Sequence, residues 1–261
     1  MDIVVIGSGN VSTNLSLSLK DVGHNIVQVY SRKIENAKDL GKRVDAIPID
    51  DLKEIYTSAD IYIICVKDDA IRNVIEGMPK VSGILAHTAG SVPIEVFKYG
   101  NEWCGKSSGY GVMYPLQTFS KNRRIDLKDV PFFLESSDSA TMDNLKMLCA
   151  GISNNINVLD SESRKYVHLS AVFANNFSNH MFTIASKILE ARNISFDVLK
   201  PLMKETVNKI EAMNPLDAQT GPAVRYDERV MQNHLKLLQS DHYKEIYQMI
   251  SDSIHRHSMD K

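Results

Sequence analysis

Four short apolar runs, separated by segments of helical character, constrain the fold of this chain more than any other feature of its sequence. Such runs are typical of strands buried on both faces, and the segments between them are long enough to cross over as helices. The sequence therefore predicts an α/β fold with a doubly wound parallel sheet that helices cover on both faces. The four runs are Ile3–Ile6, Ile26–Tyr30, Asp60–Val66 and Gly83–His87.

Three more strand-like segments follow the parallel units. They are Gly111–Tyr114, Pro131–Glu135 and Asn155–Leu159, with one helix around Ser139–Cys149. We expect them to extend the same sheet.

From residue 161 onward every segment has helical character. The sequence therefore predicts a sheet domain over residues 1–160 and an all-α domain over residues 161–261. The first helix of the second domain, from Ser161 to about Arg192, is apolar nearly all round, which is typical of a buried helix. A domain this small offers little to cover that helix, so we expect a homodimer joined through the helical domain.

The charge balance argues against several classes of partner. The 30 Lys and Arg and 32 Asp and Glu residues leave a net charge of −2, too small to attract nucleic acid or an acidic membrane. No apolar stretch reaches the ~18 residues that span a bilayer, and no signal-peptide pattern is present. We therefore expect a cytoplasmic protein with a small-molecule substrate. Cys65, Cys104 and Cys149 are odd in number and far apart, which predicts neither a disulfide framework nor a metal site.

A glycine-rich turn between the first strand and its helix predicts a dinucleotide site. The spacing is Gly7-x-Gly9-x-x-Ser12, with serine in place of the usual third glycine. The first glycine permits the tight turn, and the second lets a diphosphate approach the backbone amides at the helix N-terminus. The alternative is a plain strand–helix turn. The residues expected to contact the diphosphate are Gly7, Ser8, Gly9, Asn10 and Val11.

The end of the second strand favours NADP(H) over NAD(H). Sites for NAD(H) usually place an acidic residue there, whereas this chain has Ser31 and Arg32. A guanidinium can grip a 2′-phosphate with two hydrogen bonds, and Ser31 can add a third. The alternative is that Arg32 is simply a solvated residue at the start of a helix.

Loops after the third and fourth runs should complete the cofactor site, because ligands bind outside the carboxyl ends of strands in such sheets. His87, at the end of the fourth run, is interpreted as a strand-end residue with a local hydrogen bond rather than as a catalyst. The residues expected to contact the ribose and nicotinamide are Val66, Lys67, Asp68, Thr88 and Ala89.

Six segments, taken in order, resemble a known family over nearly the whole chain. They are GSGNVS, ADIYIICVKDDAI, HTAGSVP, YGVMYPLQTFS, KYVHLSAVFANNF and TGPAVRYD. The chain resembles bacterial Rossmann-like proteins with a C-terminal domain of unknown function (number 2520), which are similar to pyrroline-5-carboxylate reductase, 6-phosphogluconate dehydrogenase and the 3-hydroxyacid dehydrogenases. The resemblance implies a Rossmann-like NADP-binding domain, a helical domain like the C-terminal domain of 6-phosphogluconate dehydrogenase, and NADP-dependent oxidoreductase activity. The family usually has histidine where this chain has Tyr114. We expect Tyr114 to contact the substrate.

Polar residues on the long helix are candidates for catalysis. The positions that recur at helical spacing and share one face are Lys165, His168, Val172, Asn175 and Asn179. The related hydroxyacid dehydrogenases carry a lysine and an asparagine one turn apart, but here Leu169 stands where the asparagine would fall. His168, Lys165 and Asn176 are therefore the predicted catalytic residues. The alternatives are that they bridge neighbouring helices or a dimer interface, and that Lys165 is only an exposed residue of the first turn.

One more segment, in the loop before the last two helices, has the chemistry to bind a carboxylate. Thr220 and the amides of the Gly221 turn can donate hydrogen bonds, and Arg225 can clamp the anion with two more. A plain interhelix turn is the alternative, and Asp227 is interpreted as a helix N-cap.

These features predict an NADP(H)-dependent oxidoreductase that transfers a hydride to or from a small C=O or C=N substrate. The alternative is a non-catalytic NADP(H)-binding sensor or interaction protein, since Rossmann folds host many functions. A methyltransferase dependent on S-adenosylmethionine would need an acidic residue where Ser31 and Arg32 stand.

Overall fold

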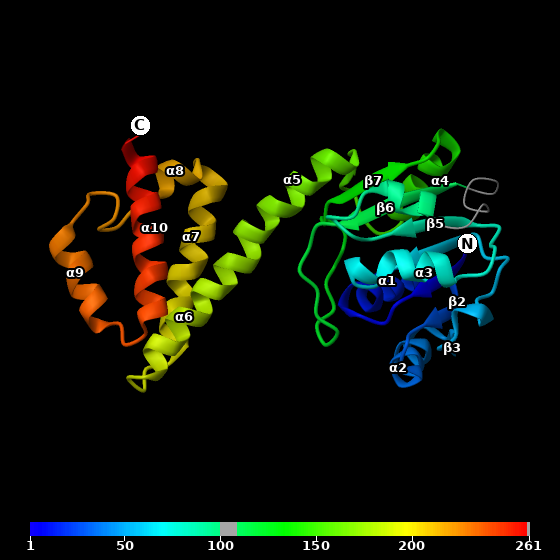
Figure 1. Cartoon of the computed structure of the whole chain (residues 1–261), viewed down its shortest axis with the longest axis horizontal. Helices are drawn as coiled ribbons and strands as arrows, with labels where there is room; N and C mark the ends of the chain where they lie inside the picture. The colour runs from blue at the N-terminus through cyan, green and yellow to red at the C-terminus, as the bar shows by residue number, and fades with distance from the viewer. Residues whose placement is uncertain (100–108, 260–261) are drawn as a thin grey trace. The chain divides into compact units, whose positions relative to one another are not determined.

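The computed structural model describes residues 1–99 and 109–259, so Cys104 lies outside the described residues. The chain divides into two compact units, Met1–Asn175 and Asn176–Lys261 (Figure 1). The first helix of the predicted all-α domain, α5 (Ser161–Ala171), belongs to the first unit.

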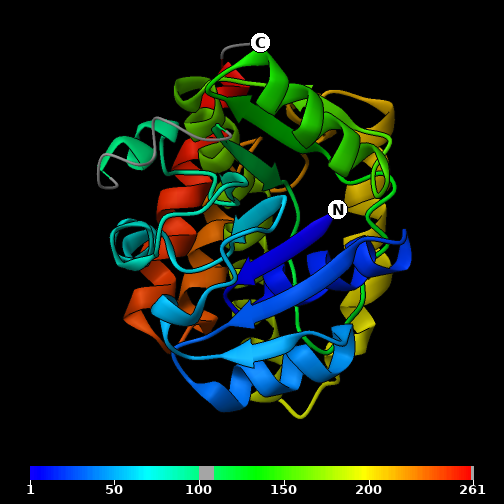
Figure 2. The ribbon, with the colours of Figure 1, turned by 90° about the vertical axis from the view of Figure 1, so that its right-hand side faces the viewer.

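The first unit is built on an eight-stranded sheet with the strand order β3-β2-β1-β4-β5-β6-β7-β8. All neighbouring strands pair in parallel except β6 and β7, and Figure 2 shows the arrows of β1, β2 and β3 pointing the same way. The strand order reverses direction between β1 and β4, so a doubly wound α/β sheet with its extension is confirmed. The strands are β1 (Asp2–Ile6), β2 (Asn25–Tyr30), β3 (Ile47–Ile49), β4 (Ile61–Ile64), β5 (Ile84–His87), β6 (Tyr110–Pro115), β7 (Phe132–Ser136) and β8 (Ile156–Val158).

Apolar side chains cover both faces of the sheet. In β1, Ile3 and Val5 pack with the core under one face, whereas Val4 and Ile6 pack with the core under the other. This alternation follows from the period of two in a strand. Helices α1 (Asn10–Asp21), α2 (Ile34–Val44) and α4 (Ser139–Ala150) contribute to the first core, and α3 (Ile71–Gly77) and the 3-10 helix η3 (Ile94–Tyr99) contribute to the second.

The second unit is helical, and the long helix predicted from Ser161 enters it. A π-helical turn, η4 (Val172–Phe177), joins α5 to α6 (Ser178–Glu190). The helices that follow are η5 (Phe196–Leu199), α7 (Lys200–Ala212), α8 (Pro215–Ala218), α9 (Glu228–Leu237) and α10 (Asp241–Met259).

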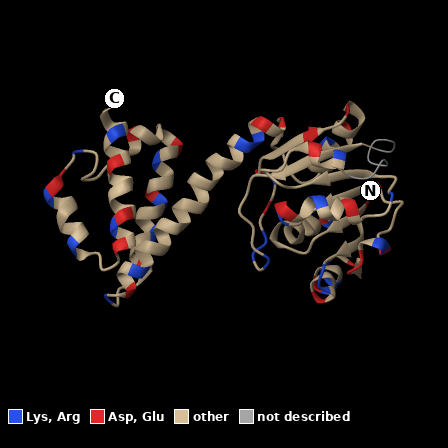
Figure 3. Ribbon diagram, viewed as in Figure 1, with Lys and Arg blue, Asp and Glu red and all other residues tan. Residues whose placement is uncertain are grey.

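The expectation that the long helix is buried is wrong for the single chain. Phe173 is 62% exposed, and Leu169, Phe177, Phe182 and Ile188 are also exposed. None of the described helices is long and apolar enough to cross a membrane. Lysine, arginine, aspartate and glutamate are interspersed along both units, in keeping with the small net charge (Figure 3).

Candidate functional site at the carboxyl ends of the strands

The turn after β1 is closed by a glycine that no other residue can replace without strain. Gly7 has a φ of +120°, and a Cβ on it would lie 2.4 Å from the carbonyl oxygen of Cys65, just beyond β4. A Cβ on Gly9 would meet nothing within 4 Å. The turn is therefore tight on its protein side and open on its outer side, as a bound diphosphate requires.

The N-terminus of α1 offers unsatisfied backbone donors beside this turn. Gly9 is the N-cap residue, no side chain caps the helix, and its first turn holds no acidic residue. The first bond of the helix runs from the Thr13 amide to the Gly9 carbonyl at 3.0 Å. The amides of Asn10 and Val11 and the positive end of the helix dipole are thus available to an anion. These residues fit the diphosphate of a dinucleotide.

The loop after β2 lies next to the glycine turn. Ser8 Oγ donates to Ser31 Oγ at 3.0 Å, which joins the two loops. Arg32 is exposed and forms no ion pair among the described residues. Burial raises the pKa of Tyr30, Arg32 acts against that rise, and Asp51 and Asp50 add to it. The sequence after β2 has no carboxylate, but the fold brings two of them near from the end of β3.

The loops after β4 and β5 are joined to each other at the same edge of the sheet. Asp68 accepts a hydrogen bond from Ser91 Oγ across these two loops. The Thr88 amide donates to the Ile64 carbonyl at 3.2 Å, and the Ala89 amide donates to His87 Nδ1 at 3.2 Å. Val66 is half-buried and Lys67 is exposed. The structure therefore gathers the predicted cofactor-binding residues along the carboxyl ends of β1, β2, β4 and β5.

Tyr114 and His168 form a polar pair at the far end of this edge. Tyr114 stands near the end of β6, and its hydroxyl lies 3.0 Å from Nδ1 of His168 on α5. A Cβ on Gly90 would lie 2.8 Å from both His168 Nδ1 and Tyr114 Cζ, so the β5 loop packs directly on the pair. Burial and the nearby Asp68 raise the pKa of Tyr114. The sequence predicted both residues as site residues but not that they are partners.

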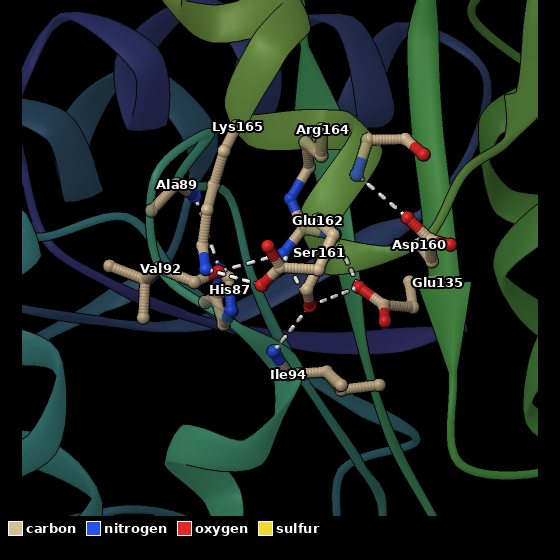
Figure 4. A network of polar contacts seen from close by, with 11 residues as sticks. His87, Ala89, Val92, Ile94, Glu135, Asp160, Ser161, Glu162, Arg164 and Lys165 are labelled. Atoms are coloured by element: carbon tan, nitrogen blue, oxygen red, sulfur yellow. Dashed lines mark hydrogen bonds and ion pairs between the residues drawn. The ribbon is translucent and has the colours of Figure 1, made fainter.

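Sequence reasoning missed the buried polar cluster beside this pair (Figure 4). Arg164 on α5 is fully buried and forms an ion pair with Glu135 of β7. It also donates to the Val92 carbonyl at 2.7 Å and to Ser161 Oγ at 3.2 Å. Its place in the polar first turns of α5 gave no signal that it would be buried.

His87 is also buried beside this cluster. Its Nδ1 accepts the local bond from Ala89, as the sequence predicted. Burial, with a smaller contribution from Arg164, lowers the pKa of His87 to about 3, although the Pro93 carbonyl acts the other way. His87 is therefore neutral at physiological pH and acts as part of the scaffold.

Of the remaining predicted residues, Lys165 lies on α5, three residues before His168, and the others lie in the second unit. Lys165 has a side chain that is 43% exposed and pairs with Glu162 at 2.6 Å. Asn176 is exposed in η4, and Arg225 is exposed after a turn in which Gly221 has a φ of +113°. Thr220 contributes to a mainly apolar cavity of 390 Å³ in the helical unit.

Two further polar groups lie in the helical unit. Asp227 caps α9 by accepting the Val230 amide at 3.2 Å, as predicted. His234 Nδ1 lies 2.9 Å from the Tyr247 hydroxyl, and both residues line the 390 Å³ cavity. Within residues 1–99 and 109–259, no three His, Cys, Asp or Glu side chains come together as a metal site would need.

Comparisons with known proteins agree with this arrangement. Residues 2–87 match the family model described as NADP oxidoreductase, coenzyme F420-dependent, and residues 130–254 match the domain of unknown function DUF2520. No curated protein sequence matches the chain.

Solved structures cover nearly the full length of the chain. A "putative NADP oxidoreductase" from Bacteroides fragilis is 43% identical, with 98% of each chain covered and a TM-score of 0.89. A reductive aminase from Aspergillus terreus, in complex with NADPH and ethyl-5-oxohexanoate, is 14% identical, covers 99% of this chain and 94% of its own, and has a TM-score of 0.74. A pyrroline-5-carboxylate reductase from Coxiella burnetii is 18% identical, covers 99% and 97%, and has a TM-score of 0.55. The chain thus belongs to the family of Rossmann-like NADP oxidoreductases that carry a C-terminal DUF2520 domain.

Proposed function

We propose that this oxidoreductase transfers a hydride between NADP(H) and a small compound with a C=O or C=N bond. One observation carries the proposal. A single edge of the sheet holds an uncapped helix N-terminus beside a free guanidinium, and also, several strands away, a tyrosine–histidine pair. The first feature suits a phosphorylated dinucleotide, and the second suits proton transfer to a reacting atom. The reductive aminase of the same fold, solved with NADPH and a keto ester, is consistent with this substrate class.

The residues along the edge divide the cofactor among them. Gly7, Ser8, Gly9, Asn10 and Val11 would hold the diphosphate. Ser31 and Arg32 would hold the 2′-phosphate. The β4 and β5 loops would hold the nicotinamide half through Val66, Lys67, Asp68, Thr88 and Ala89. When bound, the cofactor supplies the hydride, while the chain supplies orientation and electrostatics.

His168 is the residue we assign as proton donor in the reducing direction. A protonated imidazole donates from Nδ1 to the Tyr114 oxygen and keeps its Nε2 proton for the substrate. Nε2 of His168 would supply a proton to the oxygen or nitrogen of the C=O or C=N bond, and a proton from solvent would replace it. The raised pKa of Tyr114 keeps the phenol protonated throughout.

The other predicted site residues have secondary places in this scheme. Lys165 is the weaker candidate for proton donor because Glu162 already pairs with it. Asn176, Thr220 and Arg225 belong to the helical unit and remain predicted site residues without a step of their own. Tyr114 would orient His168 and limit the size of the substrate.

We further propose that the protein is a homodimer joined through its helical unit. So many exposed apolar side chains on α6 and α7 would be unfavourable on the surface of a monomer, and a second copy would cover them. They include Phe182 and Ile188 on α6 and Leu202, Val207 and Ile210 on α7.

Thermal unfolding with NADPH, NADH or no nucleotide tests the cofactor assignment. Ligand at 100 times its dissociation constant should add about 2.7 kcal/mol to stability. We expect a larger rise in melting temperature with NADPH than with NADH at equal concentration. If neither nucleotide raises the melting temperature, the proposal fails.

Turnover separates the enzyme from a non-catalytic NADP(H)-binding protein. Loss of NADPH absorbance would be followed with small aldehydes, with ketones, and with ketones mixed with amines. We expect oxidation of NADPH with at least one class, and a loss of 10²-fold or more in His168→Gln with NADPH binding retained. Binding without turnover across all classes would favour the sensor.

A further inference from the structure

Arg164 ties three elements of the first unit together. Its guanidinium contacts Glu135 on β7, the Val92 carbonyl in the loop after β5, and Ser161 at the start of its own helix (Figure 4). Ser161 Oγ also accepts the Ile94 amide at 2.9 Å and donates to Glu135 at 2.7 Å. The β5 loop is therefore fastened to α5 at two backbone groups.

The β5 loop and α5, which Arg164 joins, also meet at a second contact, between Gly90 and His168. Gly90 lies in the loop between His87 and Val92, and His168 lies one helical turn beyond Arg164 on α5. Gly90 is packed so closely on Tyr114 and His168 that a Cβ would overlap both rings. Any change in the spacing between loop and helix must therefore move this contact.

A stabilising role alone explains Arg164 poorly. Its Nε is buried and has no hydrogen-bond partner. The desolvation cost of a buried ion pair can exceed its Coulombic gain, and replacing both partners by apolar residues is often neutral or stabilising. His87 is also buried, and the same guanidinium helps to lower its pKa. A buried charge that is not fully satisfied, under this one contact, fits a structure kept for its geometry.

We propose that Arg164 is a positioning residue, which holds the β5 loop against α5 so that Tyr114 and His168 stay hydrogen-bonded beneath Gly90. The proposal rests on the role assigned to His168 above. Arg164 itself touches no reacting atom. It acts through Val92 and Ser161 on the loop, and along one turn of α5 on the imidazole.

The test reads the state of the His168 ring directly and needs no substrate. Protein labelled with ¹⁵N-histidine gives the Nδ1 resonance and the pKa of His168 by ¹H–¹⁵N correlation, with His168→Gln for assignment. Tyr114→Phe removes only the hydroxyl and so defines the signals of a broken pair. We expect Arg164→Met to move both signals toward those of Tyr114→Phe, and Arg164→Lys to restore them in part.

Two controls separate positioning from general damage. Lys187→Met removes the same charge from an exposed residue of α6 and should leave the His168 signals unchanged. Adenosine 2′,5′-bisphosphate, which probes only the adenosine half of the cofactor site, should bind Arg164→Met within about twofold of the wild type. If Arg164→Met does not fold, Ser161→Ala removes the bond to Ile94 and should shift the signals in the same direction by less.

A folded variant at Arg164, or at Ser161, with wild-type His168 signals would overturn the proposal. That failure is distinct from failure of the proposed function. If the wild-type protein did not bind NADPH, the proposed function would be wrong. The His168 signals of the variants would still report whether Arg164 positions the ring.

Discussion

At the scale of single residues, the proposed preference for NADP(H) over NAD(H) rests on Arg32. Arg32 is exposed and stands next to Ser31, which is bonded to the glycine turn through Ser8. Its guanidinium is thus the cation best placed for a phosphate on the adenosine ribose. Asp50 and Asp51 act on the pKa of Tyr30 in the opposite direction to Arg32, so the local field is mixed rather than purely positive.

Arg32→Ala should therefore separate the two nucleotides. Loss of a charge-assisted contact to the 2′-phosphate should weaken NADPH binding about 10- to 100-fold and change NADH binding by less than about twofold. Calorimetric titration of both nucleotides checks this, with Lys38→Ala on the exposed face of α2 as the control. If Arg32→Ala weakened the binding of NADPH and NADH equally, Arg32 would not be the residue that selects NADP(H).

His87 gives the protein a defined loss of stability in acid. Its folded pKa of about 3 lies below the value of 6.5 that it has when unfolded, so the unfolded state binds the proton first. The stabilisation is fully present above pH 6.5 and is lost as the pH falls toward 3, by at most about 1.4 kcal/mol per pH unit. Urea unfolding at pH 6.5, 5.5 and 4.5 should show this slope removed in His87→Leu. Parallel curves for the two proteins would contradict the assignment.

Whole elements were easier to predict than the contacts between them. The turn from Gly7 to Gly9 and the apolar runs identified the sheet, because strand periodicity and glycine spacing are local properties. The segment from Asp50 to Tyr56 forms only a short 3-10 turn, η1 (Leu52–Glu54), although Asp50 is a favourable residue at a helix start. The side chain of Gln28, distant in sequence, takes the Glu54 carbonyl and the Tyr56 amide, which a longer helix would use.

The site shows the same limit. Tyr114 and His168 are 54 positions apart, and only the fold brings them to 3.0 Å. Burial of Arg164 depends on Glu135 from another strand, so no local pattern marks it. The π-helical turn η4 lies between His168 and Asn179 and has more residues per turn than an α-helix. Residues that would share one face of a regular α-helix therefore do not stay aligned beyond this turn.

The N-terminus of α1 can be used to test the cofactor site at the scale of one element. Gly9→Asp would place an N-cap carboxylate on the open amides, since a Cβ there meets nothing within 4 Å. We expect the free protein to gain about 0.3–1 kcal/mol from capping and the helix dipole, and to lose NADPH binding through repulsion. Gly9→Ala introduces the Cβ without the charge and is the matched control. Chemical unfolding and nucleotide titration measure the two effects, and retained binding in Gly9→Asp would exclude this turn as the diphosphate site.

At the scale of the whole molecule, the proposed homodimer rests on the exposed apolar side chains of the helical unit. Leu202→Glu alters a side chain that is 64% exposed in the single chain. It should therefore leave the fold intact but weaken a dimer joined through α7, because a charge would be buried there. Light scattering after gel filtration should show a shift from dimer to monomer, while Asn208→Glu, with the same added charge, should remain dimeric. A wild-type monomer at micromolar concentration would rule out the proposed assembly.

The carbonyl of Cys65 occupies the space that a side chain on Gly7 would need. The bend that receives the cofactor is therefore shaped jointly by two strands distant in sequence. A chimera that takes over this nucleotide-binding segment must therefore include both β1 and β4. A graft of β1, the turn and α1 alone would lack the Cys65 carbonyl, against which the turn packs.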